Sequence, residues 1–170
     1  MIAQSPRSTR SARVVPWVST AARLLLAGVF LAAGGLKVVD PQASVSAVEA
    51  YELLPAGAAV LVGWALPFVE IVLGLLLAVG VFTRVLAVAS AVLLALFIAG
   101  VLSAAARGLS IDCGCFGGGG AVAAGQTRYT SEVVRDALLL LVAGWLVWQP
   151  RSRLALEPLE LGRHDVEGAR

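Results

Sequence analysis

The two cysteines of the chain lie two positions apart, in the sequence Cys113-Gly114-Cys115. Cysteines this close can form a disulfide ring only with backbone strain, and the glycine between them relaxes that demand. A strained disulfide is more easily reduced than an ordinary one, whereas a structural disulfide normally closes a longer loop. The spacing therefore favours an exchangeable redox pair. The alternative is a short disulfide that shapes a loop, or two unrelated thiols.

The surroundings of the pair suggest which partners it could have. Asp112 disfavours a thiolate beside it by like charge, so we expect Cys115 to ionise more easily than Cys113. The glycines at 117–120 leave the pair open to the active site of another protein. Because the only histidine, His164, lies far away in the C-terminal tail, the chain cannot build a four-ligand zinc site, and we expect no metal. The predicted site has two catalytic cysteines and four supporting residues, Asp112, Gly114, Phe116 and Arg135.

Three charged residues fall within apolar segments, namely Arg23, Lys37 and Glu70. A charge in hydrocarbon is costly unless it is paired or near water. We expect Arg23 and Glu70 to form a buried pair that fixes helix packing. We expect Lys37 to extend toward Asp40 or the lipid headgroups. The alternative for Glu70 is a role linked to protons or to a quinone.

The composition indicates which solvent the chain is built for. Hydrophobic residues make up 59% of the chain and charged residues 14%, with a mean hydropathy of +0.88. A soluble domain carries roughly a quarter charged residues, so this chain is predicted to lie in a lipid bilayer. The net charge of +2 is small and the basic residues form no patch, which argues against a nucleic-acid partner.

The apolar residues fall into four segments long enough to cross a membrane, at about residues 17–39, 57–82, 85–106 and 133–149. Helices satisfy their own backbone hydrogen bonds, so we predict an all-α membrane protein with a bundle of four transmembrane helices. Asp40 and Pro41 are typical of a helix start, and they predict a short interfacial helix in the first outer connection. The alternative for the first segment is a cleaved signal peptide, which would leave an odd number of spans.

The distribution of charge predicts the orientation and the limits of the membrane domain. Arginines concentrate in a basic tail (1–16), in the second connection and after the fourth segment. The positive-inside rule therefore places both termini in the cytoplasm and the cysteine loop (107–131) outside, in a multi-pass protein of the cell membrane. The membrane domain spans 17–150, and we expect the tail at 151–170 to be disordered. Arg135 lies at the outer start of the fourth segment, where it could help to dock the cysteine loop.

Several short motifs along the chain resemble those of a known family. They are Arg23–Gly28, Gly35–Lys37, Asp40-Pro41, Tyr51–Pro55, Leu66-Pro67, Glu70, Ile111–Gly117 and Arg135-Asp136. Over about residues 20–150 the chain thus resembles the MauE branch of the DoxX-like membrane proteins, with Asp136 where asparagine is expected. The resemblance implies a four-helix membrane bundle. MauE proteins are associated with forming disulfides in the small subunit of methylamine dehydrogenase beside a thioredoxin-like partner. That substrate need not transfer to this chain.

The sequence therefore predicts a membrane-embedded thiol–disulfide redox protein that exchanges electrons with an extracytoplasmic thioredoxin-like partner or substrate, and it leaves open whether the chain is itself a thiol–disulfide oxidoreductase. The electrons then pass to a quinone in the bundle or to a second extracytoplasmic protein, because the chain has no further cysteines to carry them across. No other cofactor is evident. One alternative is a noncatalytic membrane scaffold for assembly of a redox enzyme. Another is a small transporter that uses Glu70 and Arg23.

Overall fold

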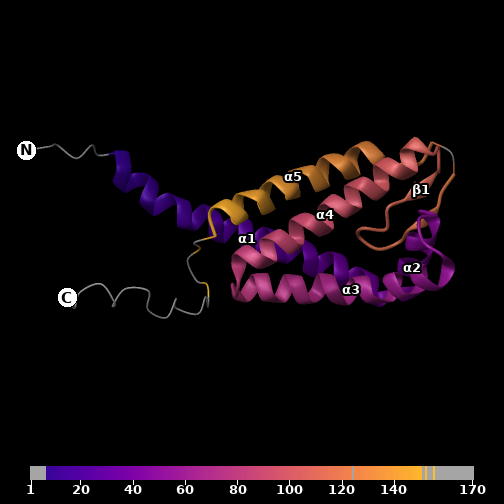
Figure 1. Cartoon of the computed structure of the whole chain (residues 1–170), viewed down its shortest axis with the longest axis horizontal. Coiled ribbons are helices and arrows are strands. Elements are labelled where there is room, and N and C mark those ends of the chain that lie inside the picture. The colour runs from indigo at the N-terminus through magenta and orange to yellow at the C-terminus, as the bar shows by residue number, and fades with distance from the viewer. Residues whose placement is uncertain (1–6, 124, 151, 153–154, 156–170) are drawn as a thin grey trace, which may run out of the picture.

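The computed structural model of the chain describes residues 7–123, 125–150, 152 and 155, and most of these are helical (Figure 1). In chain order the helices of this part are α1 (Arg7–Val39), α2 (Pro41–Ala50), α3 (Ala56–Val79), α4 (Thr83–Ala106) and α5 (Tyr129–Trp148). Two short strands, β1 (Ile111–Asp112) and β2 (Gly120–Ala121), lie between α4 and α5. The predicted C-terminal tail, with His164, falls almost wholly outside the described residues.

Three of the described helical segments are long and apolar enough to cross a membrane, namely α3, α4 and the Val14–Val39 part of α1. The fourth predicted span, α5, does not belong to this group, since Glu132, Arg135 and Asp136 lie in its first two turns. α1 also begins at Arg7, so that part of the predicted basic tail is helical. The helical architecture was thus predicted, while α5 is more polar than a simple span.

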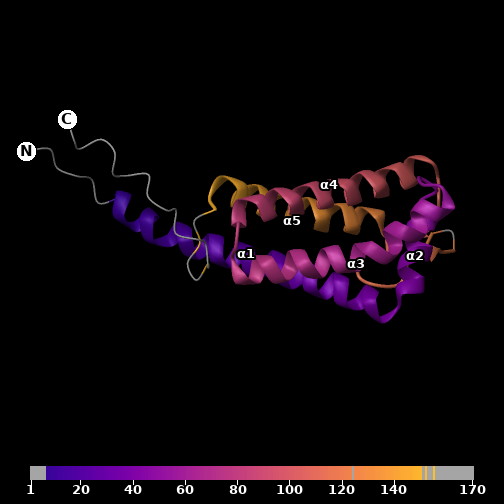
Figure 2. The same cartoon turned by 60° about the horizontal axis from the view of Figure 1, so that its bottom comes forward.

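The long helices form two pairs, with α1 beside α3 and α4 beside α5 (Figure 2). α1 also contacts α5, which joins the two pairs. The four helices share an apolar core that includes Leu26, Phe30, Leu77, Leu94 and Leu146. Many large apolar side chains instead point outward, and Leu61, Leu96 and Leu141 are 69%, 63% and 71% exposed. Such an apolar exterior is suited to lipid rather than to water.

Two glycines bring helix backbones into direct contact. A Cβ atom placed on Gly34 of α1 would lie 2.7 Å from the carbonyl oxygen of Pro67 on α3. One placed on Gly63 of α3 would lie 2.6 Å from Cα of Val45 on α2. Neither position has room for a side chain, as is usual where membrane helices pack closely. These contacts fix which residues of α1 and α2 face which residues of α3.

A helix occupies the first connection, where the sequence predicted one. The carboxylate of Asp40 accepts a hydrogen bond from the Ala43 amide at 3.0 Å, and Pro41 occupies the first turn. The hydroxyl of Ser44 donates to the carbonyl oxygen of Gly63 at 2.9 Å. α2 is therefore capped at its start and attached to α3. Its position at a membrane interface remains a prediction.

The cysteine loop folds back over α2. β1 and β2 pair antiparallel, with Ile111 opposite Ala121. The phenol of Tyr129 donates to the Leu109 carbonyl oxygen at 2.6 Å and accepts from the Ile111 amide at 3.1 Å, which ties the start of the loop to α5. Gly119 has a φ of +116° and contacts Ala47 of α2, so a larger residue could not take its place.

Candidate functional site

Lys37, in the last turn of α1, is the residue that joins the cysteine loop to the helices. Its ammonium donates to both carboxylate oxygens of Glu70 on α3, at 2.7 and 2.8 Å. It also donates to the carbonyl oxygen of Cys115 at 2.9 Å. Lys37 and Glu70 are 3% and 1% exposed. An ammonium group has three N–H donors, so these three acceptors use all of them.

The predicted buried pair of Arg23 and Glu70 does not form. Glu70 pairs with Lys37, and the guanidinium of Arg23 donates instead to the carbonyl oxygens of Leu77 and Ala78, at 2.7 and 2.9 Å. The contact of Gly34 with Pro67 and Glu70 sets the register, because Lys37 lies one turn from Gly34 on α1. Arg23 is three turns away in the other direction and therefore lies opposite the end of α3.

The two cysteines differ in exposure and are not joined by a disulfide. Cys113 is half-buried, whereas Cys115 is buried, with 7% of its surface exposed. The backbone amide of Cys115 donates to Sγ of Cys113 at 3.2 Å. Gly114 between them has a φ of +67°, and a Cβ atom there would lie 2.5 Å from Cβ of Ala47. The predicted need for glycine between the cysteines thus has two causes, backbone conformation and close approach to α2.

The fold makes Cys113 the more acidic thiol, contrary to the expectation from the sequence. A hydrogen bond from the Cys115 thiol stabilises the Cys113 thiolate and lowers the pKa of Cys113. The same hydrogen bond, together with burial, raises the pKa of Cys115. Cys113 is therefore the nucleophile that the geometry favours.

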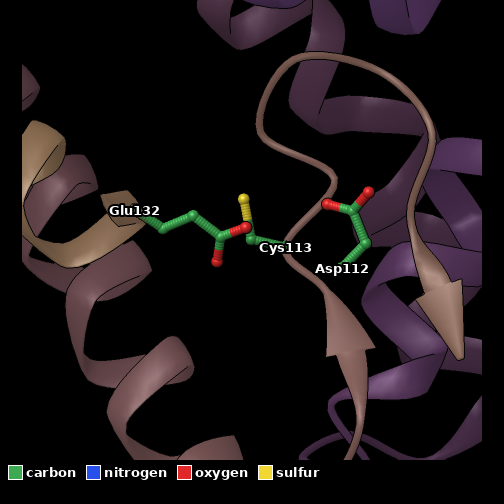
Figure 3. Close-up of side chains that lie close together, drawn as sticks. All are labelled: Asp112, Cys113 and Glu132. Atoms are coloured by element: carbon green, nitrogen blue, oxygen red, sulfur yellow. The ribbon is translucent and has the colours of Figure 1, made fainter. Parts of the chain in front are cut away.

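Glu132, in the first turn of α5, is a site residue that sequence reasoning missed. Its side chain extends from α5 toward Cys113, and Asp112 lies on the other side of the sulfur (Figure 3). One ligand atom from each of these three residues lies within 4.8 Å of the others. Three such donors are fewer than a closed zinc site uses, and we assign no metal to them. The signal available in the sequence was an acidic residue three positions before Arg135, which was itself singled out.

Arg135 contacts the cysteine loop as the sequence suggested. Its guanidinium carbon lies 4.8 Å from the centre of the Phe116 ring, a cation–π contact. Its Nε donates to the Asp136 carboxylate at 2.9 Å, which holds the guanidinium in place. The predicted supporting residues Asp112, Gly114, Phe116 and Arg135 therefore all lie around the two cysteines. Arg23 does not belong to this group.

A cavity of about 300 Å³ adjoins the cysteine pair. Its lining comes mainly from apolar side chains of α2, α3, α4 and the residues that follow α2. Lys37, Tyr51 and both cysteines also contribute to the lining. The phenol of Tyr51 donates weakly to the carbonyl oxygen of Cys113, at 3.4 Å. Both cysteines therefore border this cavity, and Cys113 is also partly exposed.

Comparison with known proteins places the chain in a family. Residues 15–149 match the sequence model of the family described as methylamine utilisation protein MauE. The chain belongs to the MauE family. No curated protein and no solved structure matched it. Membership agrees with the resemblance carried by the sequence motifs, and with the three apolar helical segments it identifies a multi-pass membrane protein that lies in a lipid bilayer.

The buried pair of Lys37 and Glu70 yields a stability prediction. Glu70→Gln or Lys37→Met alone should lower the free energy of unfolding by about 3–5 kcal/mol, because each leaves one buried charge without its partner. The variant that carries both changes should lose much less free energy of unfolding than the sum of the two single losses. Unfolding of the detergent-solubilised chain measures both effects. Glu49→Gln, the same kind of change at an exposed residue of α2, serves as the control and should shift stability by less than about 0.5 kcal/mol. Additive effects of the two single changes would show that the pair is not coupled.

The hydrogen bond between the thiols yields a pH prediction. In the reduced protein, alkylation should modify Cys113 faster than Cys115, with a midpoint below the ordinary thiol pKa of about 8.5. Cys115→Ala removes the donor and should move the Cys113 midpoint upward, whereas Ser110→Ala in the same loop should leave it unchanged. Mass spectrometry after timed alkylation at a series of pH values gives both rates. Faster alkylation of Cys115 would contradict the assignment.

Proposed function

We propose that this MauE-family protein performs thiol–disulfide exchange with an extracytoplasmic partner through Cys113 and Cys115. The observation that carries the proposal is the asymmetry of the pair. Cys113 is partly exposed and its thiol has a lowered pKa, while Cys115 beside it is buried and held through its carbonyl oxygen by Lys37. One thiol is thus presented to the partner, and the other stays beside it to leave from the internal disulfide or to form it again, as exchange through a mixed disulfide requires.

The exchange can be written so that bonds, electrons and protons balance. A thiolate of the partner attacks Sγ of Cys113 in the Cys113–Cys115 disulfide, and Cys115 leaves as a thiolate that takes up a proton. The partner's second thiolate then attacks the partner sulfur of the mixed disulfide and releases Cys113 as a thiolate. The partner loses two electrons and becomes a disulfide, and the cysteine pair gains them. The same steps run in reverse when the partner is the oxidant.

Glu132 is placed to handle the proton of Cys113. Its carboxyl group lies near Sγ of Cys113 and its side chain is 7% exposed. A buried carboxyl group at this distance can receive the thiol proton as the thiolate forms, directly or through one water molecule. Its attachment to the first turn of α5 keeps it beside the loop while Cys113 changes partner.

A thioredoxin-like protein is the partner class that we propose. The glycines around the pair leave room for a partner's active site, and the MauE resemblance points to the same class.

We propose that α5 is a fourth span, since it packs along α4. With four spans both termini lie on the same side of the membrane. The positive-inside rule assigns that side to the cytoplasm, and the cysteine loop then lies outside. Thiols there can be oxidised and remain so. The transporter alternative loses its support, because Glu70 and Arg23 do not meet.

Replacement of the cysteines tests this function. The purified chain, first oxidised, should oxidise a reduced dithiol peptide, and Cys113→Ser, Cys115→Ser and the double variant should each reduce this reaction to the uncatalysed rate. Ser103→Ala in α4, a change of similar size away from the pair, should retain the wild-type rate. Membrane insertion and melting temperature show whether each variant has folded. An unchanged rate in the folded double variant would contradict exchange and would favour the noncatalytic scaffold.

A further inference from the structure

The cavity beside the cysteine pair opens toward the lipid-facing surface of the protein. Leu53, Val62 and Leu96 line it and are 54%, 39% and 63% exposed. Val62 of α3 and Leu96 of α4 belong to the apolar exterior of the helices, which in a membrane faces acyl chains, and Leu53 lies in the connection that precedes α3. A ligand that enters through this opening must therefore be hydrophobic and come from the bilayer. The volume of about 300 Å³ is at the small end of the range for ligand pockets and suits a single substituted ring.

The polar groups of the cavity favour a neutral ligand with hydrogen-bond acceptors. Burial raises the pKa of the Tyr51 phenol, which stays protonated and can donate a hydrogen bond. All three N–H groups of Lys37 are already taken by Glu70 and by the Cys115 carbonyl oxygen. Among the described lining residues, Lys37 is the one cation, and it is neutralised by Glu70. A fatty acid or a phosphate headgroup would thus find no cation available, whereas a carbonyl oxygen would find the phenol.

The second relevant feature is that both cysteines contribute to the cavity wall. A reduced cysteine pair must give up two electrons and two protons before it can react again, and the sequence holds no further cysteine to receive them. A ligand in this cavity would lie beside both cysteine residues. The cavity therefore brings a membrane-soluble molecule to the one place where the two electrons are held.

We propose that this cavity binds the ring of a lipid-soluble quinone, which reoxidises Cys113 and Cys115. The two thiols become a disulfide and release two electrons and two protons, and the quinone takes up both and becomes a quinol. Tyr51 donates a hydrogen bond to one quinone carbonyl and so positions the ring. The hydrophobic tail of the quinone leaves through the opening between Val62 and Leu96. The proposal rests on the exchange function proposed above and names its electron acceptor.

Filling the cavity tests the site. A Cβ atom on Gly100 of α4 would lie in ordinary contact with the Tyr51 ring, at 3.4 Å, so the longer side chain of Gly100→Leu would extend into the space beside it. Val62→Phe narrows the opening from the other helix. The matched control is Gly144→Leu, because Gly144 is an exposed glycine on α5 with open space around its Cβ position. Melting temperatures establish that each variant folds.

The probe is decylubiquinone, whose fully substituted ring has no free position for conjugate addition of a thiol. The reduced wild-type chain in lipid nanodiscs should reduce one quinone per protein in a single turnover, measured by the loss of quinone absorbance. Binding is measured separately with the Cys113→Ser/Cys115→Ser double variant. Gly100→Leu and Val62→Phe should each weaken binding and slow reduction by roughly tenfold or more, because a filled pocket must distort to admit the ring. Gly144→Leu should match the wild type in both measurements.

The outcomes separate this proposal from the function on which it rests. Without quinone, the oxidised wild-type chain should still oxidise one dithiol peptide per protein. Suppose that it does so, but that the wild-type chain does not reduce decylubiquinone, or that both cavity variants reduce it as fast as the wild type. The quinone site is then wrong and the exchange function stands. Quinone binding without reduction would also overturn the proposal. If the peptide is not oxidised, the exchange function itself fails.

Discussion

The arrangement of the site depends on one buried ammonium group. Removing the charge of Lys37 from water is costly, and the cost is offset only because the Glu70 carboxylate and the Cys115 carbonyl oxygen surround it. Two helices and the cysteine loop are therefore connected through a single side chain. The backbone at Cys115 cannot move away without leaving an N–H of that ammonium unsatisfied in an apolar interior. This constraint holds Cys115 in place while Cys113, two residues earlier, remains free to react.

The glycines of the helices and of the loop provide the geometry that this interaction needs. Gly34 lets α1 approach α3 closely enough for Lys37 to reach Glu70. Gly63 of α3 lets the backbone of α2 approach α3 equally closely. Gly114 and Gly119 then let the loop lie directly on Ala47 of α2. At Arg107 the end of α4 is attached to the same region, since its guanidinium donates to the Tyr51 carbonyl oxygen. The cysteine pair is thus positioned by contacts in which a larger side chain would not fit.

Much of this could be predicted from the sequence, but the pairings could not. Apolar segments and the Asp40-Pro41 start predicted the helices, and the Cys-Gly-Cys spacing indicated where to look for a candidate site. The partner of Glu70 depends on the register of α1 against α3, which the glycine contacts set and which composition does not reveal. The acidity order of the two thiols depends on hydrogen bonds between Cys113 and Cys115 that form only in the folded loop, which the like charge of Asp112 alone does not reveal. Glu132 is 19 residues from Cys113 in the sequence and becomes its neighbour only when α5 is in place.

The central claim is that Cys113, and not Cys115, forms the mixed disulfide with the partner. Covalent trapping in membranes tests this most directly, with Cys115→Ala expressed in the full chain and free thiols blocked on lysis. The account predicts a disulfide-linked adduct on Cys113 that disappears on reduction, and no comparable adduct in Cys113→Ala, whose remaining thiol is buried. Equal adducts in both variants would contradict the assigned roles, and the absence of any adduct in either would contradict exchange through this pair.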